Sequence, residues 1–201
     1  MRLIALIFVF SFISGCAVFK GNAIPLIPDE ALDFRAKNPL KVYNKWVLDS
    51  DSSIILPSFK DQVESSAKIS FEKSLHTAGC CVLVDSKEDA DIVVDGVVIQ
   101  RSNFAAILPA AITGASLYTI PSWATNNLKI EAFVRRKNGV TKNYTITDST
   151  ILVQWLPMIF VMPFVGDIVS VSKEVNDNMH KTLVEKIGRD RFFSGSSAAG
   201  F

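Results

Sequence analysis

Apolar residues recur along one stretch of the chain at the four-residue spacing of a helix face. The members of this first stripe are Phe59, Val63, Ala67, Phe71 and Leu75. Ser58 precedes the stripe, with Asp61 three residues later, which is the pattern of a helix start, and Gly79 follows as a stop signal. The pattern therefore predicts a helix from Ser58 to Gly79 with one face on a core.

A second stripe of the same kind lies near the end of the chain. Its members are Ile168, Val171, Val175, Met179, Leu183 and Ile187. Ser170 or Ser172 is expected to cap this second helix, and Gly188 is expected to end it.

Short apolar or alternating runs between the stripes predict strands. The runs are 41–48, read as an edge strand, then 54–57, 80–84, 90–99, 128–134 and 140–148. The last two flank Asn138-Gly139, the strongest short-range signal for a β-hairpin. Along the hairpin, Ile130 and Val134 are expected to face inward, together with Tyr144 and Ile146.

The order of these elements is strand, helix, strand, strand, hairpin, helix. It predicts an α/β fold, a two-layer sandwich with two helices packed on one face of a mixed sheet. We assign residues 54–193 to this single domain, 16–53 to a tether with the edge strand, and 194–201 to a flexible tail.

The first fifteen residues have a different pattern. Arg2 supplies a positive charge, 3–13 is almost entirely apolar, and Ile13-Ser14-Gly15-Cys16 follows. This is the order of a secretory signal peptide, and its last four residues resemble the lipobox of bacterial lipoproteins. The resemblance implies that Cys16 becomes the first residue of the mature protein and carries acyl chains such as palmitate.

Two other interpretations of this start are an uncleaved transmembrane helix and an ordinary signal peptide. The run 3–13 would rise only about 16 Å as a helix, roughly half a hydrocarbon core. Residue 17 is Ala rather than the Asp that tends to retain such lipoproteins at the inner membrane. The resemblance thus implies the periplasmic face of the outer membrane, with the inner membrane as the alternative.

The domain resembles a group of envelope proteins. The residues that carry the likeness are Ile54-Ile55-Leu56-Pro57-Ser58-Phe59 and Ala90-Asp91-Ile92-Val93-Val94-Asp95-Gly96. They are similar to patterns in the amino-terminal domain of the Tol–Pal translocation protein, the curli-secretion lipoprotein and the lipoprotein activators of penicillin-binding proteins. Thr119-Ile120-Pro121-Ser122-Trp123 and Trp155-Leu156-Pro157 resemble a set of uncharacterised proteobacterial lipoproteins.

Charge excludes one class of partner. The chain has 21 Lys and Arg against 20 Asp and Glu, and loss of Arg2 with the signal leaves 20 against 20. A neutral chain has no basic field to attract nucleic acid. Cys80 and Cys81 are adjacent, and we expect two buried thiols rather than a bond between neighbours.

Two uncharged segments, 102–128 and 149–166, flank the hairpin, so both should emerge at the same end of the sheet. Their apolar parts, 104–120 and 151–164, have three interpretations: packing on the sheet and on each other, contact with the membrane, or docking of a protein partner or second copy. The residues assigned to such contact are Leu108, Tyr118, Ile120, Trp123, Trp155, Leu156, Ile159 and Phe160.

No catalytic, metal-binding or cofactor-binding motif is evident. His76 and His180 are each expected at a helix surface, and Asp91 and Asp95 lie too far apart along a strand for a paired acid and base. The leading hypothesis is a non-enzymatic binding or assembly module, acting with an envelope protein or with copies of itself. The alternatives are an envelope hydrolase, which would need Asp95, His76 or His180 beside a nucleophile, and a subunit of a secretion or pore oligomer.

Overall fold

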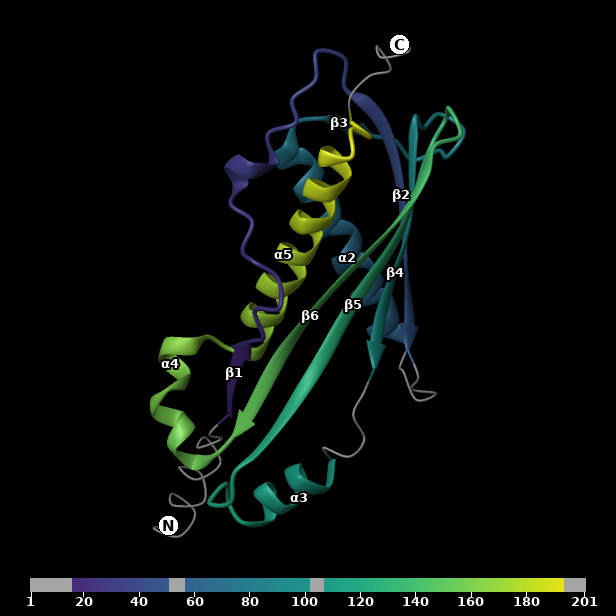
Figure 1. Cartoon of the computed structure of the whole chain (residues 1–201). Coiled ribbons are helices and arrows are strands. Elements are labelled where there is room, and N and C mark those ends of the chain that lie inside the picture. The colour runs from purple at the N-terminus through teal and green to yellow at the C-terminus, as the bar shows by residue number, and fades with distance from the viewer. Residues whose placement is uncertain (1–15, 51–56, 102–106, 194–201) are drawn as a thin grey trace, which may run out of the picture. The chain divides into compact units, whose positions relative to one another are not determined.

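The computed structural model describes residues 16–50, 57–101 and 107–193, which form a mixed six-stranded sheet with helices (Figure 1). The strands are β1 (Cys16–Lys20), β2 (Leu40–Ser50), β3 (Cys81–Leu83), β4 (Ile92–Arg101), β5 (Ser122–Arg136) and β6 (Thr141–Gln154). The helices are η1 (Asp29–Leu32), α2 (Pro57–Ala78), α3 (Ile107–Ala115), η3 (Leu156–Phe160), α4 (Met162–Val165) and α5 (Ile168–Arg189).

The strand order is β1-β6-β5-β4-β2-β3. β1 pairs with β6 antiparallel, whereas β2 pairs parallel with both β3 and β4. The predicted mixed α/β fold is confirmed, although the structure adds the short helices α3 and α4 to the two long ones.

The chain divides into two compact units, through which β5, β6 and α5 run. Unit 1 consists of residues 1–21, 102–127 and 149–175, and unit 2 of residues 22–101, 128–148 and 176–201.

In unit 2, α2 and the later part of α5 share one face of the sheet (Figure 1). The Trp46 ring of β2 contacts Phe71 of α2 at 5.4 Å and His180 of α5 at 4.8 Å between ring centroids. Ser70 Oγ donates to Asp177 Oδ1 at 2.6 Å and joins the two helices. Trp46 therefore sits at the centre of this core.

The two helical stripes are confirmed over most of their length. Ala67, Phe71 and Leu75 are buried on α2, and Gly79 ends that helix in the left-handed conformation, with φ +62°. On α5 the stripe is buried except at its first member, Ile168. Phe59 is also exposed, so each helix leaves the core at its amino-terminal end.

Both predicted ends of α5 are wrong. Asp167, not a serine, caps the helix, because its Oδ1 accepts from the backbone N–H of Val169 at 2.8 Å and Ser170 at 3.0 Å. Gly188 lies inside the helix instead of ending it, and a Cβ there would come within 2.4 Å of the Phe34 ring. This glycine is required by close packing rather than by a turn.

β2, β5 and β6 are longer than the alternation predicts, β4 is as long but begins and ends two residues later, and β3 is shorter, whereas the hairpin is as expected. Gly139 occupies the turn with φ +88°, and Ile130, Val134, Tyr144 and Ile146 are buried. β2 is not the outermost strand, yet β3 covers only Leu40–Val42, so the rest of β2 has an open edge on that side. Of the run expected as a strand at 54–57, Pro57 instead begins α2, and 54–56 lie outside the described residues, as do 1–15 and 194–201.

The segment after Cys16 is not a free tether. Cys16–Lys20 forms β1, in which Ala17 and Val18 are buried, and Leu32 of η1 is fully buried. Apolar side chains at these positions have enough area to bury, so the segment joins the fold.

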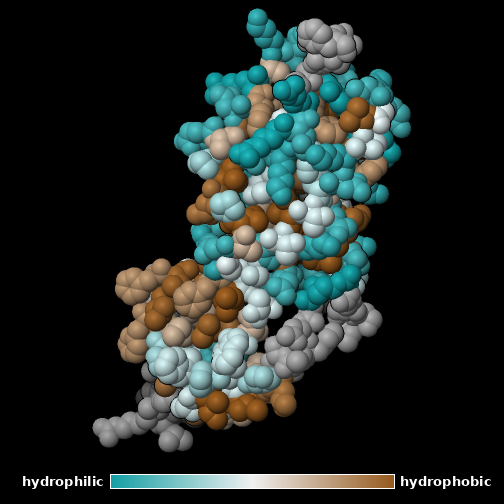
Figure 2. All heavy atoms as spheres, in the orientation of Figure 1, coloured by the Kyte–Doolittle hydropathy of each residue, from teal (hydrophilic) through white to brown (hydrophobic). Residues whose placement is uncertain are grey.

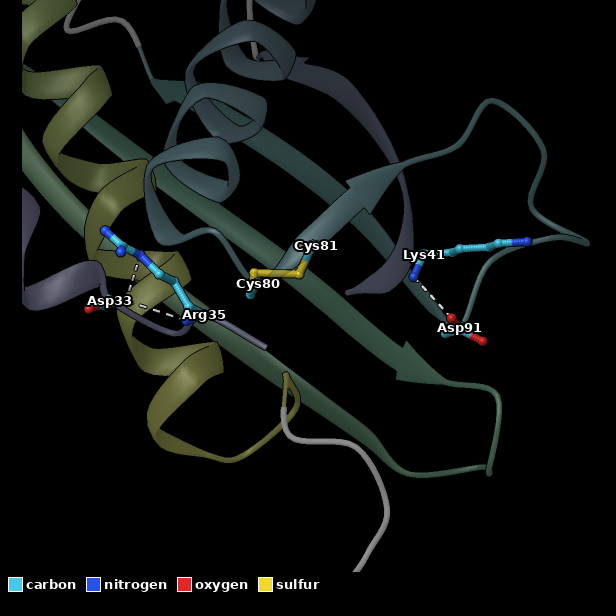
Figure 3. Close-up of a disulfide and its surroundings, with 6 residues drawn as sticks. All are labelled: Asp33, Arg35, Lys41, Cys80, Cys81 and Asp91. Atoms are coloured by element: carbon cyan, nitrogen blue, oxygen red, sulfur yellow. Dashed lines mark hydrogen bonds and ion pairs between the residues drawn. A yellow bond between two sulfur atoms is a disulfide. The ribbon is translucent and has the colours of Figure 1, made fainter. Parts of the chain in front are cut away.

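The expectation of two free thiols at Cys80 and Cys81 is wrong, because a disulfide bond joins these neighbours (Figure 3). The expectation placed both in one strand, where successive side chains point to opposite faces. In the structure the chain turns at Gly79 and β3 begins only at Cys81, so Cys80 is free of that alternation.

Candidate functional site

Unit 1 contains every residue that the sequence assigned to membrane or partner contact. Trp123 is 70% exposed, Leu108 69% and Phe160 79%, while Ile120, Trp155 and Leu156 are also exposed. Tyr118 and Ile159 are half-buried. Side chains of this size are seldom left in water together, so they mark a candidate contact surface.

The structure adds exposed apolar side chains that the sequence did not single out. Phe164 on α4 is 86% exposed, and Ile168 and Val169 follow at the start of α5. We call the exposed large apolar side chains of unit 1 the apolar set: Leu108, Ile112, Leu117, Ile120, Trp123, Trp155, Leu156, Phe160, Phe164, Ile168 and Val169. Figure 2 shows hydrophobic residues gathered around α4 and around α3.

The sequence position of Ile168 and Val169 indicates that they lie at the very start of α5, although the helical stripe assigns Ile168 to the core. Both are apolar, and they follow Gly166 and the Asp167 cap directly, so they lie in the first turn of α5. The stripe periodicity assigns Ile168 to the core, but the structure leaves both Ile168 and Val169 exposed.

The two uncharged segments meet within unit 1, as the hairpin connectivity predicts. The backbone N–H of Leu156 donates to the carbonyl oxygen of Tyr118 at 2.8 Å. Leu117 and Tyr118 both have positive φ, +54° and +62°, which is uncommon for large side chains and costs roughly 1–2 kcal/mol per residue. The turn after α3 is thus held in a strained conformation that exposes Leu117.

Hydroxyl groups around this turn bond to the chain itself. Thr113 Oγ1 donates to Pro109 O at 3.0 Å, and Thr113 is fully buried. Ser116 Oγ donates to Thr113 O at 2.9 Å and also accepts from the Ile120 N–H at 3.2 Å. Thr119 Oγ1 donates to Ser116 O at 2.7 Å. The turn therefore exposes apolar side chains on a scaffold whose polar groups already have partners.

Cys16 lies beside the apolar set. In the β1–β6 register it is opposite Gln154, whose Nε2 is 3.9 Å from the Cys16 Sγ. Trp155 and η3 follow Gln154 directly, and both α4 and η3 contact β1 (Figure 1). An acyl group on Cys16 would start within a few residues of exposed Trp155 and Leu156.

The described charges of unit 1 lie outside the two uncharged segments. Lys20 pairs with Glu174, and Lys173 is exposed on α5. Backbone and side-chain hydrogen bonds from Ser170 lower the pKa of Asp167, so this cap is a carboxylate at neutral pH.

Of the three residues that an envelope hydrolase is expected to use, His180 and Asp95 lie on opposite faces of the sheet, and His76 is exposed on α2. His180 is fully buried, contrary to the surface position expected from sequence, because it packs on the Trp46 and Phe71 rings. Asp95 faces the opposite side of the sheet from Trp46, since the next residue, Gly96, lies directly against the Trp46 ring. Asp95 instead pairs with Lys87 at 3.5 Å and Arg135 at 3.7 Å.

Unit 2 has a groove of about 490 Å³ along the open edge of β2. Its lining mixes acidic and basic side chains of α2 with backbone and side chains of β2 and the end of β3. Glu64 Oε1 accepts from the Leu48 N–H at 2.9 Å, and Glu72 Oε1 accepts from Asn44 Nδ2 at 3.0 Å. Glu64 thereby supplies an acceptor that a neighbouring strand would otherwise provide, whereas Glu72 bonds to a side chain of β2.

The described part of the chain contains no group of three or more His, Cys, Asp or Glu side chains placed to hold a metal ion. Among the same residues, no helix has both the length and the apolar character needed to cross a bilayer.

Comparison with known proteins gives only distant structural likeness. No family model and no curated protein matches the chain. A homologue of neuraminyllactose-binding hemagglutinin from Helicobacter pylori is 12% identical, with a TM-score of 0.43 over 85% of this chain and 96% of that one. The PelC dodecamer from Paraburkholderia phytofirmans is also 12% identical, with a TM-score of 0.35 over 85% of this chain and 96% of that one.

Proposed function

We propose that this chain is a lipid-anchored lipoprotein of the bacterial envelope that works as a non-enzymatic binding or assembly module. The observation that carries the proposal is the position of Cys16. It ends a pattern that resembles a lipobox, and it lies opposite Gln154, next to the exposed apolar side chains of η3. The anchor and the contact surface would therefore act at the same place.

The engagement of the ionisable groups supports a non-enzymatic role. A hydrolase needs a base or acid that can reach its substrate, but His180 is enclosed by aromatic rings. Asp95 lies between two cations on the other face of the sheet. The exposed surface of unit 1 offers apolar side chains for binding rather than groups for chemistry.

The resemblance to envelope lipoproteins supports the location. It favours the periplasmic face of the outer membrane over the inner membrane, because Ala follows Cys16. It also favours work through an envelope protein or through self-association, and the neutral charge of the mature chain favours no nucleic-acid role.

The test is to express the full chain in a Gram-negative bacterium and measure the mass of its amino-terminal peptide. We expect cleavage before Cys16 and added acyl mass on that residue. Cys16→Ser should abolish the added mass, whereas a matched Cys80→Ser/Cys81→Ser double variant should keep it. Density-gradient separation of the two membranes should place the acylated chain with the outer one.

An amino-terminal peptide that begins at Met1, or at a residue other than Cys16, would contradict the proposal. So would a Cys16 peptide without acyl mass. If the acylated chain were found in the inner-membrane fraction, the proposed anchor would stand and only the proposed outer-membrane location would be contradicted.

A further inference from the structure

We infer that the apolar set of unit 1 enters the phospholipid leaflet and contacts acyl chains. Which leaflet it enters rests on the proposed function, since an acylated Cys16 would bring unit 1 to the membrane that holds its anchor. The contact itself depends only on the exposed residues of unit 1. The alternative occupant is a protein partner, and the two can be separated on physical grounds.

The first ground is the absence of charge. Segments 102–128 and 149–166 contain no Asp, Glu, Lys or Arg. They supply the exposed side chains of Leu108, Trp123 and Phe160. A protein interface of ordinary size has a polar rim with charged residues, whereas a leaflet interior disfavours charge throughout.

The second ground is the internal bonding of polar groups. A protein interface uses about one hydrogen bond per 100–200 Å² of contact, so it leaves donors and acceptors available to the partner. Thr113 in α3, and Ser116 and Thr119 in the turn after it, direct their hydroxyls to backbone oxygens of the same helix and turn. Satisfaction within the chain is what the hydrocarbon region requires, because no water is present there.

The third ground is the kind of aromatic residue. Trp123 and Trp155 are exposed and Tyr118 is half-exposed, and all three belong to the uncharged segments. Trp and Tyr favour the boundary between headgroups and acyl chains, since their rings are apolar and their N–H or O–H is polar. The aliphatic and Phe side chains of the apolar set would reach past this boundary into the acyl chains.

The charges of unit 1 limit how deep the contact can be. The Asp167 carboxylate caps α5 between exposed Phe164 and exposed Ile168. The Lys20–Glu174 ion pair lies on β1 and α5. These groups should stay in the headgroup region, so the chain rests on one leaflet rather than crossing it.

The experiment uses tryptophan fluorescence of the full chain, purified from membranes and reconstituted in phosphatidylcholine vesicles. One vesicle set has ordinary acyl chains, and the other has bromine atoms on the acyl chains, which quench nearby indoles. Trp46 is only 4% exposed in unit 2 and serves as an internal reference. We expect brominated lipid to lower the emission from Trp123 and Trp155 by about twofold and to leave Trp46 unchanged.

Variants show which tryptophans are quenched. The double variant Trp123→Phe/Trp155→Phe should show only Trp46 emission and no quenching, whereas Trp46→Phe should still be quenched. Phe160→Glu should reduce quenching of the remaining tryptophans, because it places a charge in the apolar set. Ile69→Glu is the matched control, since Ile69 is 60% exposed on α2 in unit 2 and should have no effect.

The test of lipid contact by the apolar set can be read separately from the test of acylation on Cys16. Acyl mass on Cys16 is measured on the same sample, so a chain without it contradicts the proposed function while quenching still decides the lipid contact. An acylated chain that stays on vesicles with no quenching of Trp123 or Trp155 overturns the inference. A photo-crosslinking residue at position 123 that then captures a protein in cells would identify the alternative occupant.

Discussion

The imidazole ring of His180 meets the Trp46 ring edge-on, with 4.8 Å between the ring centroids. Its Nδ1 lies 2.8 Å from the Asn176 carbonyl oxygen, and its Nε2 has no hydrogen-bond partner among the residues that the structure describes. Burial lowers the pKa of His180 from 6.5 to about 4, with the Asn176 carbonyl and Asp177 opposing that shift. The core therefore holds a neutral histidine.

This pKa predicts a loss of stability in mild acid. The unfolded chain binds a proton on His180 below its ordinary pKa of 6.5, whereas the folded chain resists until about pH 4. The free energy of unfolding should therefore fall as pH drops through this window, by about 2 kcal/mol between pH 7 and pH 5. Urea unfolding followed by tryptophan fluorescence at several pH values measures it.

A His180→Gln variant is expected to be less stable at pH 7 but to lose this pH dependence. His76→Gln is the control, because His76 is exposed on α2 and should leave the slope unchanged. A slope that survives in His180→Gln would show that another group causes it.

Gly96 is expected to tolerate no side chain. A Cβ at this position would come within 2.4 Å of the Trp46 ring, and both residues are in the buried face of the sheet. Gly96→Ala should lower the free energy of unfolding by about 1–3 kcal/mol, because the ring must move in a packed core. Denaturant titration gives the value.

Gly114 provides the opposite case. It lies in α3, and a Cβ there would meet no atom within 4 Å. Gly114→Ala should be neutral or stabilise by about 0.5–1 kcal/mol, because alanine loses less backbone entropy in a helix. Equal destabilisation by both substitutions would contradict the packing described for Gly96.

Glu64 is expected to protect the open edge of β2. Its carboxylate accepts from the Leu48 N–H, a strand donor that β3 is too short to reach. Glu64→Ala should cost about 1 kcal/mol, and Glu64→Gln less, because its carbonyl oxygen can still accept. Asp61→Ala, in the same groove, is the control, and a cost equal to that of Glu64→Ala would argue against the hydrogen bond.

The Cys80–Cys81 disulfide predicts the number of reactive thiols. In denaturant without reductant, neither cysteine should react with a thiol reagent, and after reduction both should react. Mass spectrometry of the labelled peptide that spans Gly79 and Val82 reads the result. Alkylation of both cysteines before reduction would show that the pair is a dithiol.

The parts of the fold that follow from sequence are those governed by local periodicity. The stripe from Ala67 to Leu75 requires a helix whichever core it packs on. Asn138-Gly139 requires a hairpin because Gly139 accepts positive φ. The hairpin in turn brings both uncharged segments into one unit, so the Leu156–Tyr118 bond follows from connectivity.

The parts of the fold that the sequence does not predict depend on contacts between residues far apart in the chain. Burial of His180 requires the Trp46 ring, 134 positions away, and no local pattern distinguishes it from a surface histidine. β1 depends on pairing between Cys16–Lys20 and the far end of β6. Ile168 fits the helical stripe, yet it is exposed while Val171, one turn later, is buried, and periodicity alone does not show where along the helix the core begins.

The pairing of β1 has a mechanical consequence for an anchored protein. A force applied through a lipid on Cys16 would be carried by the hydrogen bonds of the β1–β6 ladder from the first residue, with no slack chain to extend. If Cys16 carries the proposed lipid, unit 1 would be held directly at the membrane surface, so a partner of unit 1 would have to approach the membrane to bind it.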